Sequence, residues 1–158
     1  MPLFGGCLFP PSLSSETLDA QVNSPPAILS IRSDQEELIE PGPVVVTRGA
    51  PSQQLYAELL DTNIDDLLFV RMYVNYTVAD PTSARATCTA PVNDSPQRSV
   101  MCDISALCAQ GDVGKTLRLE IEVFDRELLD SGTPVFKAMP EDGLTTGRVY
   151  DLTCNEGT

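Results

Sequence analysis

The sequence contains no histidine and no tryptophan, and its five cysteines include no Cys-x-x-Cys pair. Without histidine there is no Ser-His or Cys-His nucleophile pair, and no imidazole ligand or proton shuttle near neutral pH. A zinc site would have to use cysteines or carboxylates alone, without the short spacing that such sites favour. We therefore expect a non-enzymatic protein that holds no metal and no cofactor.

Basic residues are also scarce. The chain has 10 lysines and arginines against 23 aspartates and glutamates, for a formal charge of -13. The phosphates of nucleic acids and of anionic lipid surfaces would repel such a chain. No apolar run reaches the roughly 18 residues that a membrane-spanning helix needs. The composition therefore predicts no nucleic-acid partner and no spanning segment.

The clearest pattern in the sequence is an alternation of apolar and charged side chains from Thr116 to Glu127. Successive side chains of a strand point to opposite faces, so this segment is predicted to be a half-buried β-strand with one wet, charged face. Its apolar face needs a second sheet to cover it. The apolar residues are Leu117, Leu119, Ile121 and Val123, and the charged ones are Arg118, Glu120 and Glu122.

Other short segments with β character follow one another from residue 27 onward, separated by turn residues. The segment 67–77 carries apolar side chains on both faces, which indicates a strand packed on two sides. The segment 103–111 has an acidic N-cap candidate and a final glycine, which predict a short helical turn. The other predicted strands cover residues 27–33, 44–47, 53–60, 83–89, 98–104 and 148–154, with a hairpin loop at 91–96.

About seven to nine such strands without a repeated helix predict an all-β, immunoglobulin-like antiparallel β-sandwich over residues 27–158. Three features are the Pro25-Pro26 start, the acidic turn from Asp61 to Asp66, and the late strand that runs into Val123–Arg126. In these features the chain resembles immunoglobulin-like, cadherin-like and polycystic-kidney-disease-type repeats of bacterial surface proteins. The resemblance implies a surface module that supports or binds other proteins.

Residues 1–26 precede the predicted sandwich. Gly5, Gly6 and Cys7 resemble the lipobox that ends a bacterial lipoprotein signal, although Phe4 stands where an aliphatic residue is usual. The proline- and serine-rich stretch that follows is typical of a flexible linker. The resemblance implies a lipid on Cys7 and a location in the bacterial cell envelope, on the periplasmic or outer-membrane face. The alternative is an ordinary free cysteine near the N-terminus.

Four cysteines remain after Cys7, and an even set in an exported chain indicates disulfides. We expect a Cys88–Cys102 bond, because these residues lie on the two arms of the predicted hairpin. We also expect Cys108–Cys154, which would join the helical turn to the last strand. A Cys102–Cys108 bond would have to close across a helix start, which is awkward geometry. Chain entropy assigns the two expected bonds about 3 and about 4 kcal/mol of stability.

The acidic turn from Asp61 to Asp66 places side-chain oxygens at alternate positions, as a calcium loop does. The glycine and the glutamate that such a loop requires are replaced by Asp66 and Met72. We interpret the segment as a turn between strands in which Asp and Asn side chains cap their own backbone.

Together these observations predict a non-enzymatic cell-envelope lipoprotein that acts as a structural or protein-binding β-sandwich module. We expect a protein partner in the envelope, and membrane contact only through a lipid anchor at Cys7. The expected working surface is a sheet edge or the end loops around 90–97 and 131–146. Two alternatives are a secreted carbohydrate-active or inhibitory domain acting through those loops, and a subunit that donates or accepts a strand.

Overall fold

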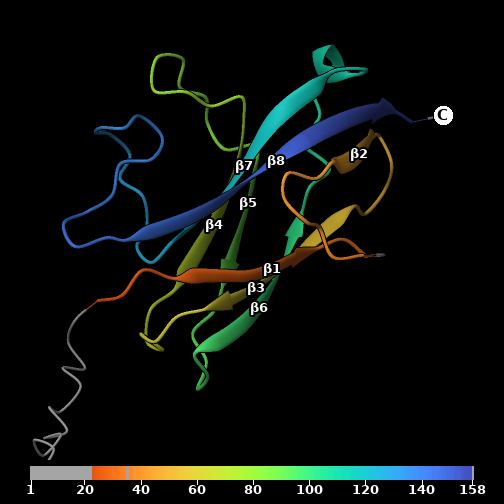
Figure 1. The fold of residues 1–158 in the computed structure, drawn as a ribbon. Helices are drawn as coiled ribbons and strands as arrows, with labels where there is room; N and C mark the ends of the chain where they lie inside the picture. Colours follow the sequence, from red (N-terminus) through yellow and green to blue (C-terminus); the bar gives the residue numbers. More distant parts are fainter. Residues whose placement is uncertain (1–22, 35, 158) are drawn as a thin grey trace, which may run out of the picture.

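The computed structural model describes residues 23–34 and 36–157, which fold into two stacked β-sheets (Figure 1). This confirms the predicted all-β sandwich. Cys7, the lipobox-like segment and most of the predicted linker lie outside the described residues. The elements are β1 (Ala27–Arg32), β2 (Val44–Arg48), β3 (Gln54–Leu60), β4 (Leu68–Val74), β5 (Ala86–Ala90), β6 (Gln97–Asp103), the 3-10 helix η1 (Gln110–Asp112), β7 (Thr116–Phe124) and β8 (Thr145–Glu156).

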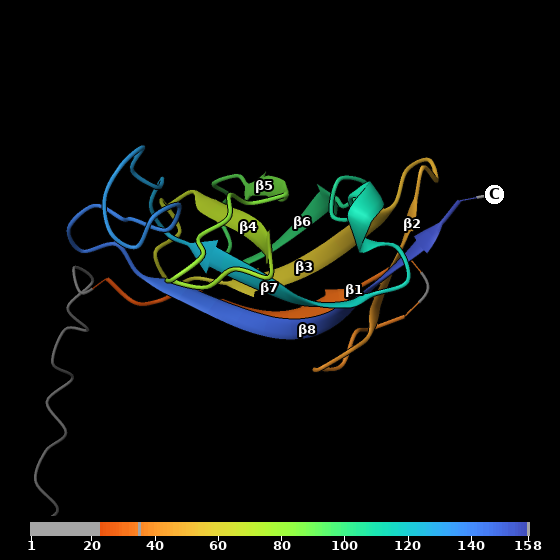
Figure 2. The same cartoon turned by 90° about the horizontal axis from the view of Figure 1, so that it is seen from above.

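The two sheets have the strand orders β1-β3-β6 and β2-β8-β7-β4-β5, and Figure 2 shows the sandwich from above. β1 and β2 follow each other in the chain but belong to different sheets, because the chain crosses between the layers over residues 33–43. β2 runs parallel to β8, whereas the other named strand pairs are antiparallel. The sequence predicted a wholly antiparallel sandwich, and the parallel β2–β8 pair is the exception.

The core lies between the layers and is built from the alternate residues of each strand. The apolar face predicted for β7 is buried, with Leu119, Ile121 and Val123 fully inaccessible to solvent. β3 supplies Leu55, Ala57 and Leu59 from the opposite sheet, and β4 supplies Leu68, Val70, Met72 and Val74 from beside β7. Full burial of each large aliphatic side chain contributes about 1.5–3 kcal/mol.

The outer face of β7 differs from the prediction, because it is only partly exposed to solvent. Tyr73 and Phe124 are buried on the outside of the five-stranded sheet, and Tyr76 lies just beyond the end of β4 in the same small cluster. The segment 125–144, called the β7–β8 loop from here on, packs Leu128 and Met139 onto this cluster. This loop is the second layer that the two-sided pattern of β4 required.

Both predicted disulfides are present: Cys88–Cys102 has a sequence separation of 14 and Cys108–Cys154 one of 46. The hairpin on which the first was predicted is wrong, because β5 pairs with β4 and β6 pairs with β3. β5 and β6 each have inward-facing residues. Burying these residues between the two sheets is more favourable than pairing β5 with β6 in one sheet. Cys88–Cys102 therefore joins the two sheets across the side of the sandwich.

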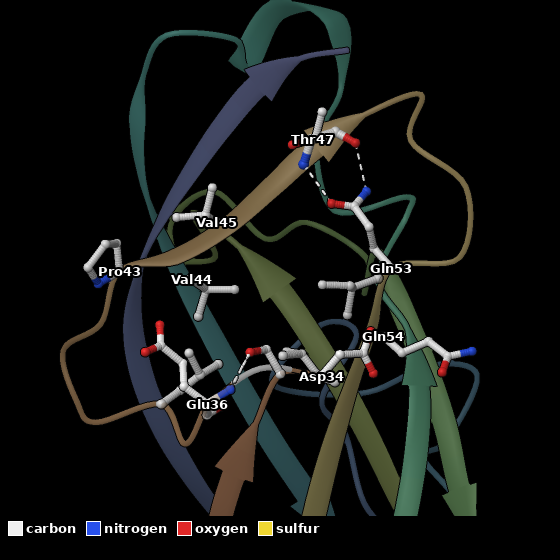
Figure 3. Close-up of a pocket in the computed structure, with 12 residues that line it drawn as sticks. Asp34, Glu36, Pro43, Val44, Val45, Thr47, Gln53 and Gln54 are labelled. Carbon is white, nitrogen blue, oxygen red and sulfur yellow. Dashed lines mark hydrogen bonds between the residues drawn. The ribbon is translucent and has the colours of Figure 1, made fainter. Parts of the chain in front are cut away.

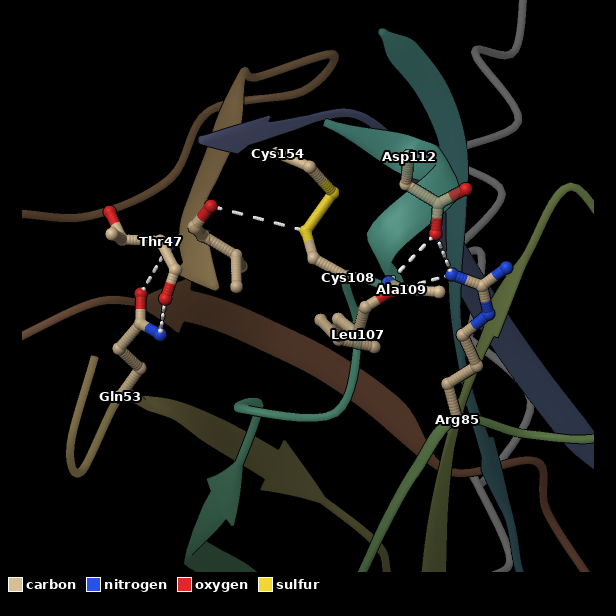
Figure 4. Close-up of a disulfide and its surroundings, with 9 residues drawn as sticks. Thr47, Gln53, Arg85, Leu107, Cys108, Ala109, Asp112 and Cys154 are labelled. Carbon is tan, nitrogen blue, oxygen red and sulfur yellow. Dashed lines mark hydrogen bonds and ion pairs between the residues drawn. A yellow bond between two sulfur atoms is a disulfide. The ribbon is translucent and has the colours of Figure 1, made fainter. Parts of the chain in front are cut away.

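The crossover from β6 to β7 holds the second disulfide (Figure 4). The predicted helical turn over 103–111 is shorter and later than expected, because η1 covers only Gln110–Asp112. Asp112 accepts hydrogen bonds from the Arg85 guanidinium and from the backbone N–H of Ala109, the latter at 2.9 Å. Burial alone would raise the pKa of Asp112, but these hydrogen bonds outweigh it and hold the pKa below its usual value.

Removing the disulfides should destabilise the sandwich in proportion to the loops that they close. We expect Cys108→Ala with Cys154→Ala to lower the free energy of unfolding by about 4 kcal/mol, and Cys88→Ala with Cys102→Ala by about 3 kcal/mol. Urea unfolding of both double variants against the wild-type chain measures these losses. Equal stability of wild type and either variant would contradict the assigned role of that bond.

Asp112 should make the free energy of unfolding depend on pH in the acidic range. Because its pKa is lower in the folded chain than in the unfolded one, its stabilising effect is complete above about pH 4 and is lost as the pH falls through the folded pKa. Asp112→Asn should therefore cost about 1.5–3 kcal/mol at pH 7 and less at about pH 2. Urea unfolding at both pH values tests this, with Asp130→Asn on the exposed loop as the matched control.

Candidate binding site at the β7–β8 loop

The β7–β8 loop presents an exposed apolar tip, which consists of Pro134, Val135 and Phe136. In Figure 1 the loop extends away from the strands on the left of the molecule. Val135 and Phe136 are 48% and 47% exposed, although both are large apolar residues. Single exposed apolar residues are common on proteins, and what distinguishes these two is how the loop holds them.

The base of the loop is closed by Asp125, a carboxylate that is 1% exposed. Its Oδ1 accepts a hydrogen bond from the backbone N–H of Leu144 at 2.7 Å, and its own N–H donates to the Leu144 carbonyl. Asn23 donates to Oδ2 at 2.5 Å and to the carbonyl of Asp142 at 2.9 Å. Thus Asn23, which belongs to the predicted linker, docks on the loop.

Two tyrosine hydroxyls hold the backbone of the tip. Tyr73 donates to the carbonyl of Phe136 at 2.8 Å, and Tyr76 donates to the carbonyl of Val135 at 2.9 Å. Their ring centroids lie 5.4 Å apart. Burial raises the pKa of Tyr73 well above its usual value, so its hydroxyl stays protonated and remains a donor at any physiological pH.

Lys137 anchors the loop from the residue next to the tip. Its ammonium lies 3.0 Å from a carboxylate oxygen of Glu120 and 3.0 Å from one of Glu122, and its side chain is only 10% exposed. It also lies over the rings of Tyr73 and Tyr76, at 4.5 and 4.0 Å from their centroids. Burial raises the pKa of Glu122, while the nearby ammonium opposes that rise.

A glycine on β8 makes room for this ion cluster. Gly147 is the register partner of Glu122, and a Cβ atom at Gly147 would lie 3.0 Å from Cγ of Glu122. A larger residue there would crowd the Glu122 side chain. Gly147 therefore lets Glu122 fold over the outer face of the sheet toward Lys137.

Phe136 has a backbone φ of 65°, in the left-handed region that bulky side chains rarely adopt. Such a conformation costs about 1–3 kcal/mol and persists only when surrounding contacts enforce it. Here the Tyr73 hydroxyl holds the carbonyl of Phe136, and the ion pairs of the largely buried Lys137 side chain hold the next residue in place. The result is a phenyl ring directed outward on a fixed backbone.

The acidic turn before β4 supports the same end of the sandwich. Asp61 Oδ1 accepts the N–H of Asn63 at 2.9 Å, which confirms the self-capping turn. Arg98, 2% exposed, donates to the carbonyls of Asn63 and Asp66, the first at 2.9 Å. Sequence reasoning missed this buried arginine, whose only signal was its inward position on β6. In the described part of the chain, no group of three or more cysteines and carboxylates is placed to hold a metal ion.

The turn also brings the two predicted end loops together. The N–H of Asp61 donates to the carbonyl of Pro96 at 2.8 Å, on the β5–β6 loop. Asp66 forms a 2.6 Å ion pair with Arg126 at the start of the β7–β8 loop. The loops predicted around 90–97 and 131–146 are therefore connected through the same turn.

Comparison with protein-family models, curated proteins and solved structures found no match for this chain. Nor does any helix in the described ranges have the length and apolar character needed to cross a membrane. The geometry of the molecule itself is therefore the basis for a proposed function.

Replacing Lys137 should loosen the loop as well as destabilise the fold. Lys137→Met leaves Glu120 and Glu122 partly buried without a cation, and we expect a loss of about 2–4 kcal/mol in the free energy of unfolding. The amides of Leu129 and residue 137, which bond to carbonyls within the loop, should exchange with deuterium faster.

A triple variant provides the matched control. Glu120→Gln and Glu122→Gln added to Lys137→Met remove the uncompensated charges, so most of the lost stability should return. Equal losses in the single and triple variants would contradict an electrostatic role for Lys137.

Proposed function

We propose that this protein is a non-enzymatic, protein-binding module of the bacterial cell envelope, anchored by a lipid on Cys7. The apolar tip of the β7–β8 loop is its contact surface. The observation that carries this proposal is Phe136: its side chain is exposed, while the strained backbone of the tip is held by two tyrosine hydroxyls and by the largely buried Lys137 side chain. Sites where surrounding contacts enforce strain are commonly sites of function.

Preorganisation explains why such a tip suits recognition. A loop that is ordered before binding does not lose backbone freedom when a partner engages it. Aromatic residues contribute disproportionately to protein interfaces, because one ring buries a large area with few rotatable bonds. The partner should therefore offer an apolar recess that accepts the ring of Phe136.

Features at two sheet edges favour the loop as the working surface and disfavour strand exchange. On β1, the Arg148 guanidinium donates to the backbone carbonyls of Ile28 and Leu29 at 2.6 and 3.1 Å. On β2, the Gln53 amide bonds to both the N–H and the C=O of Thr47, so the stretch of this edge that remains is too short to pair with a whole exchanged strand. Proteins protect edge strands with features of this kind.

The inhibitory alternative uses the same loop. A rigid, convex apolar loop would also fit the cleft of an enzyme, in which case the partner would be a hydrolase. A carbohydrate-active role has less support, because the carboxylates Glu120 and Glu122 share one lysine and lie beneath the loop. A glycosidase needs its acid pair free and facing the substrate.

Two substitutions separate the structural role of Phe136 from its proposed role in binding. Phe136→Gly removes the ring and the strain, whereas Phe136→Ala removes the ring and keeps the strain. The glycine variant should be more stable than the alanine variant by about 1 kcal/mol in urea unfolding. Both variants should lose partner binding, and normal binding by either would refute the assignment of the tip.

Site-specific photocrosslinking identifies the partner and tests the surface. We expect benzoylphenylalanine at position 136 of the full chain, in the cells that produce it, to crosslink to one protein, and the same probe at the exposed Thr87 not to do so. Excess wild-type domain should compete, and Phe136→Ala domain should not. The same crosslinks from both positions would contradict the proposal.

The anchor has its own test. Labelling with a palmitate analogue should mark the wild-type chain and not Cys7→Ser. A lack of incorporation would remove the lipid anchor and leave the binding role of the tip to be judged by crosslinking.

A further inference from the structure

A groove of about 430 Å³ lies between β2 and the start of β3 (Figure 3). It is separate from the apolar tip: Asn23, just before β1, docks on the β7–β8 loop, whereas the groove begins just after the other end of β1. We propose that this groove binds an extended peptide segment that carries a lysine or arginine beside a small apolar residue.

The first support is the unpaired edge of β2. The N–H and C=O of Thr47 point away from β8, because they bond to the side-chain amide of Gln53 at 2.7 and 2.6 Å. Backbone groups two residues apart in a strand point to the same side. Those of Val45, which lines the groove, therefore face it, and a peptide lying beside β2 can pair with them.

The hydrogen bonds of Gln53 show which groups the edge of β2 can pair with. Its amide donates to the Thr47 carbonyl and accepts from the Thr47 N–H, which are the two bonds that a neighbouring peptide group would make. A bound peptide can therefore continue past Val45 by displacing this side chain. The edge is too short for exchange of a whole strand between folded domains, and this restricts it to a short segment.

The second support is the chemistry of the groove walls. Its apolar lining includes Leu38, Val44, Leu55 and Ile104, each at most 8% exposed, which suits an apolar side chain of modest size. Asp34 and Glu36 are the charged residues of the lining, and no lysine or arginine is among them. A cationic side chain of the peptide would be attracted to these carboxylates, and an anionic one would be repelled.

Two synthetic peptides test the proposal on the wild-type chain: blocked Lys-Val-Thr-Val-Lys and blocked Glu-Val-Thr-Val-Glu. We expect the lysine peptide to bind at least about tenfold more tightly at low salt, measured by calorimetry and by amide shifts at Val45 and Leu55. Asp34→Asn with Glu36→Gln should abolish this preference. Equal binding of the two peptides, or shifts confined to other parts of the chain, would overturn the proposal.

A proline substitution tests the backbone pairing. Val45→Pro removes an N–H that β8 does not use, so the sheet is retained while binding of the lysine peptide is lost. Val45→Thr, which keeps the N–H, should bind as the wild type does. Unchanged binding by Val45→Pro would refute strand pairing. If that variant fails to fold, protection of the wild-type Val45 amide from exchange on adding the peptide decides the same question.

Discussion

The contact of Lys137 with Glu120 and Glu122 determines how the outer face of the five-stranded sheet is used. The alternation of side chains along β7 places both carboxylates on that face, beside Tyr73 of β4 and Tyr76 just after it. Without a cation, covering this face would bury like charges against each other. Lys137 neutralises them, and because it follows Phe136 directly in the chain, its inward direction accompanies the outward direction of the ring.

The loop depends in turn on a frame that reaches across both sheets. Asp125 closes its base, and the Arg126–Asp66 pair joins it to the turn that Arg98 holds from the three-stranded sheet. The Cys88–Cys102 bond then ties β6, the strand of Arg98, to β5 of the other sheet. Interactions that look local therefore link the position of the tip to the packing of the whole sandwich.

Alternation was enough to predict most strands, because burial on one face imposes a period of two on each of them. Pairing was harder to predict. Residues 91–96 have the composition of a hairpin loop, yet they connect different sheets, and local turn chemistry cannot distinguish the two. The disulfide pairing was right because Cys88 and Cys102 meet in either arrangement.

The candidate site was only partly visible in the sequence. Phe69 and Tyr73 indicated that something covers the second face of their strand, but not which segment does so. Lys137 lies in a loop and Arg98 in a strand, where basic residues are usually solvated, so neither suggested a buried ion. Their partners are distant in the chain, and only the folded arrangement brings them together. The one sequence feature that hints at the burial of Lys137 is its position between two apolar residues, Phe136 and Ala138.

The two proposed surfaces differ in shape, charge and rigidity, and this difference bears on what each can recognise. The tip is convex and apolar, and its backbone is fixed before any partner arrives, which favours a specific and lasting contact. The groove is concave and acidic, and its edge carries a glutamine that a peptide must displace, which favours weaker and more exchangeable binding. A module that holds one partner at the tip can thus leave the groove available for a cationic segment of that partner or of another protein.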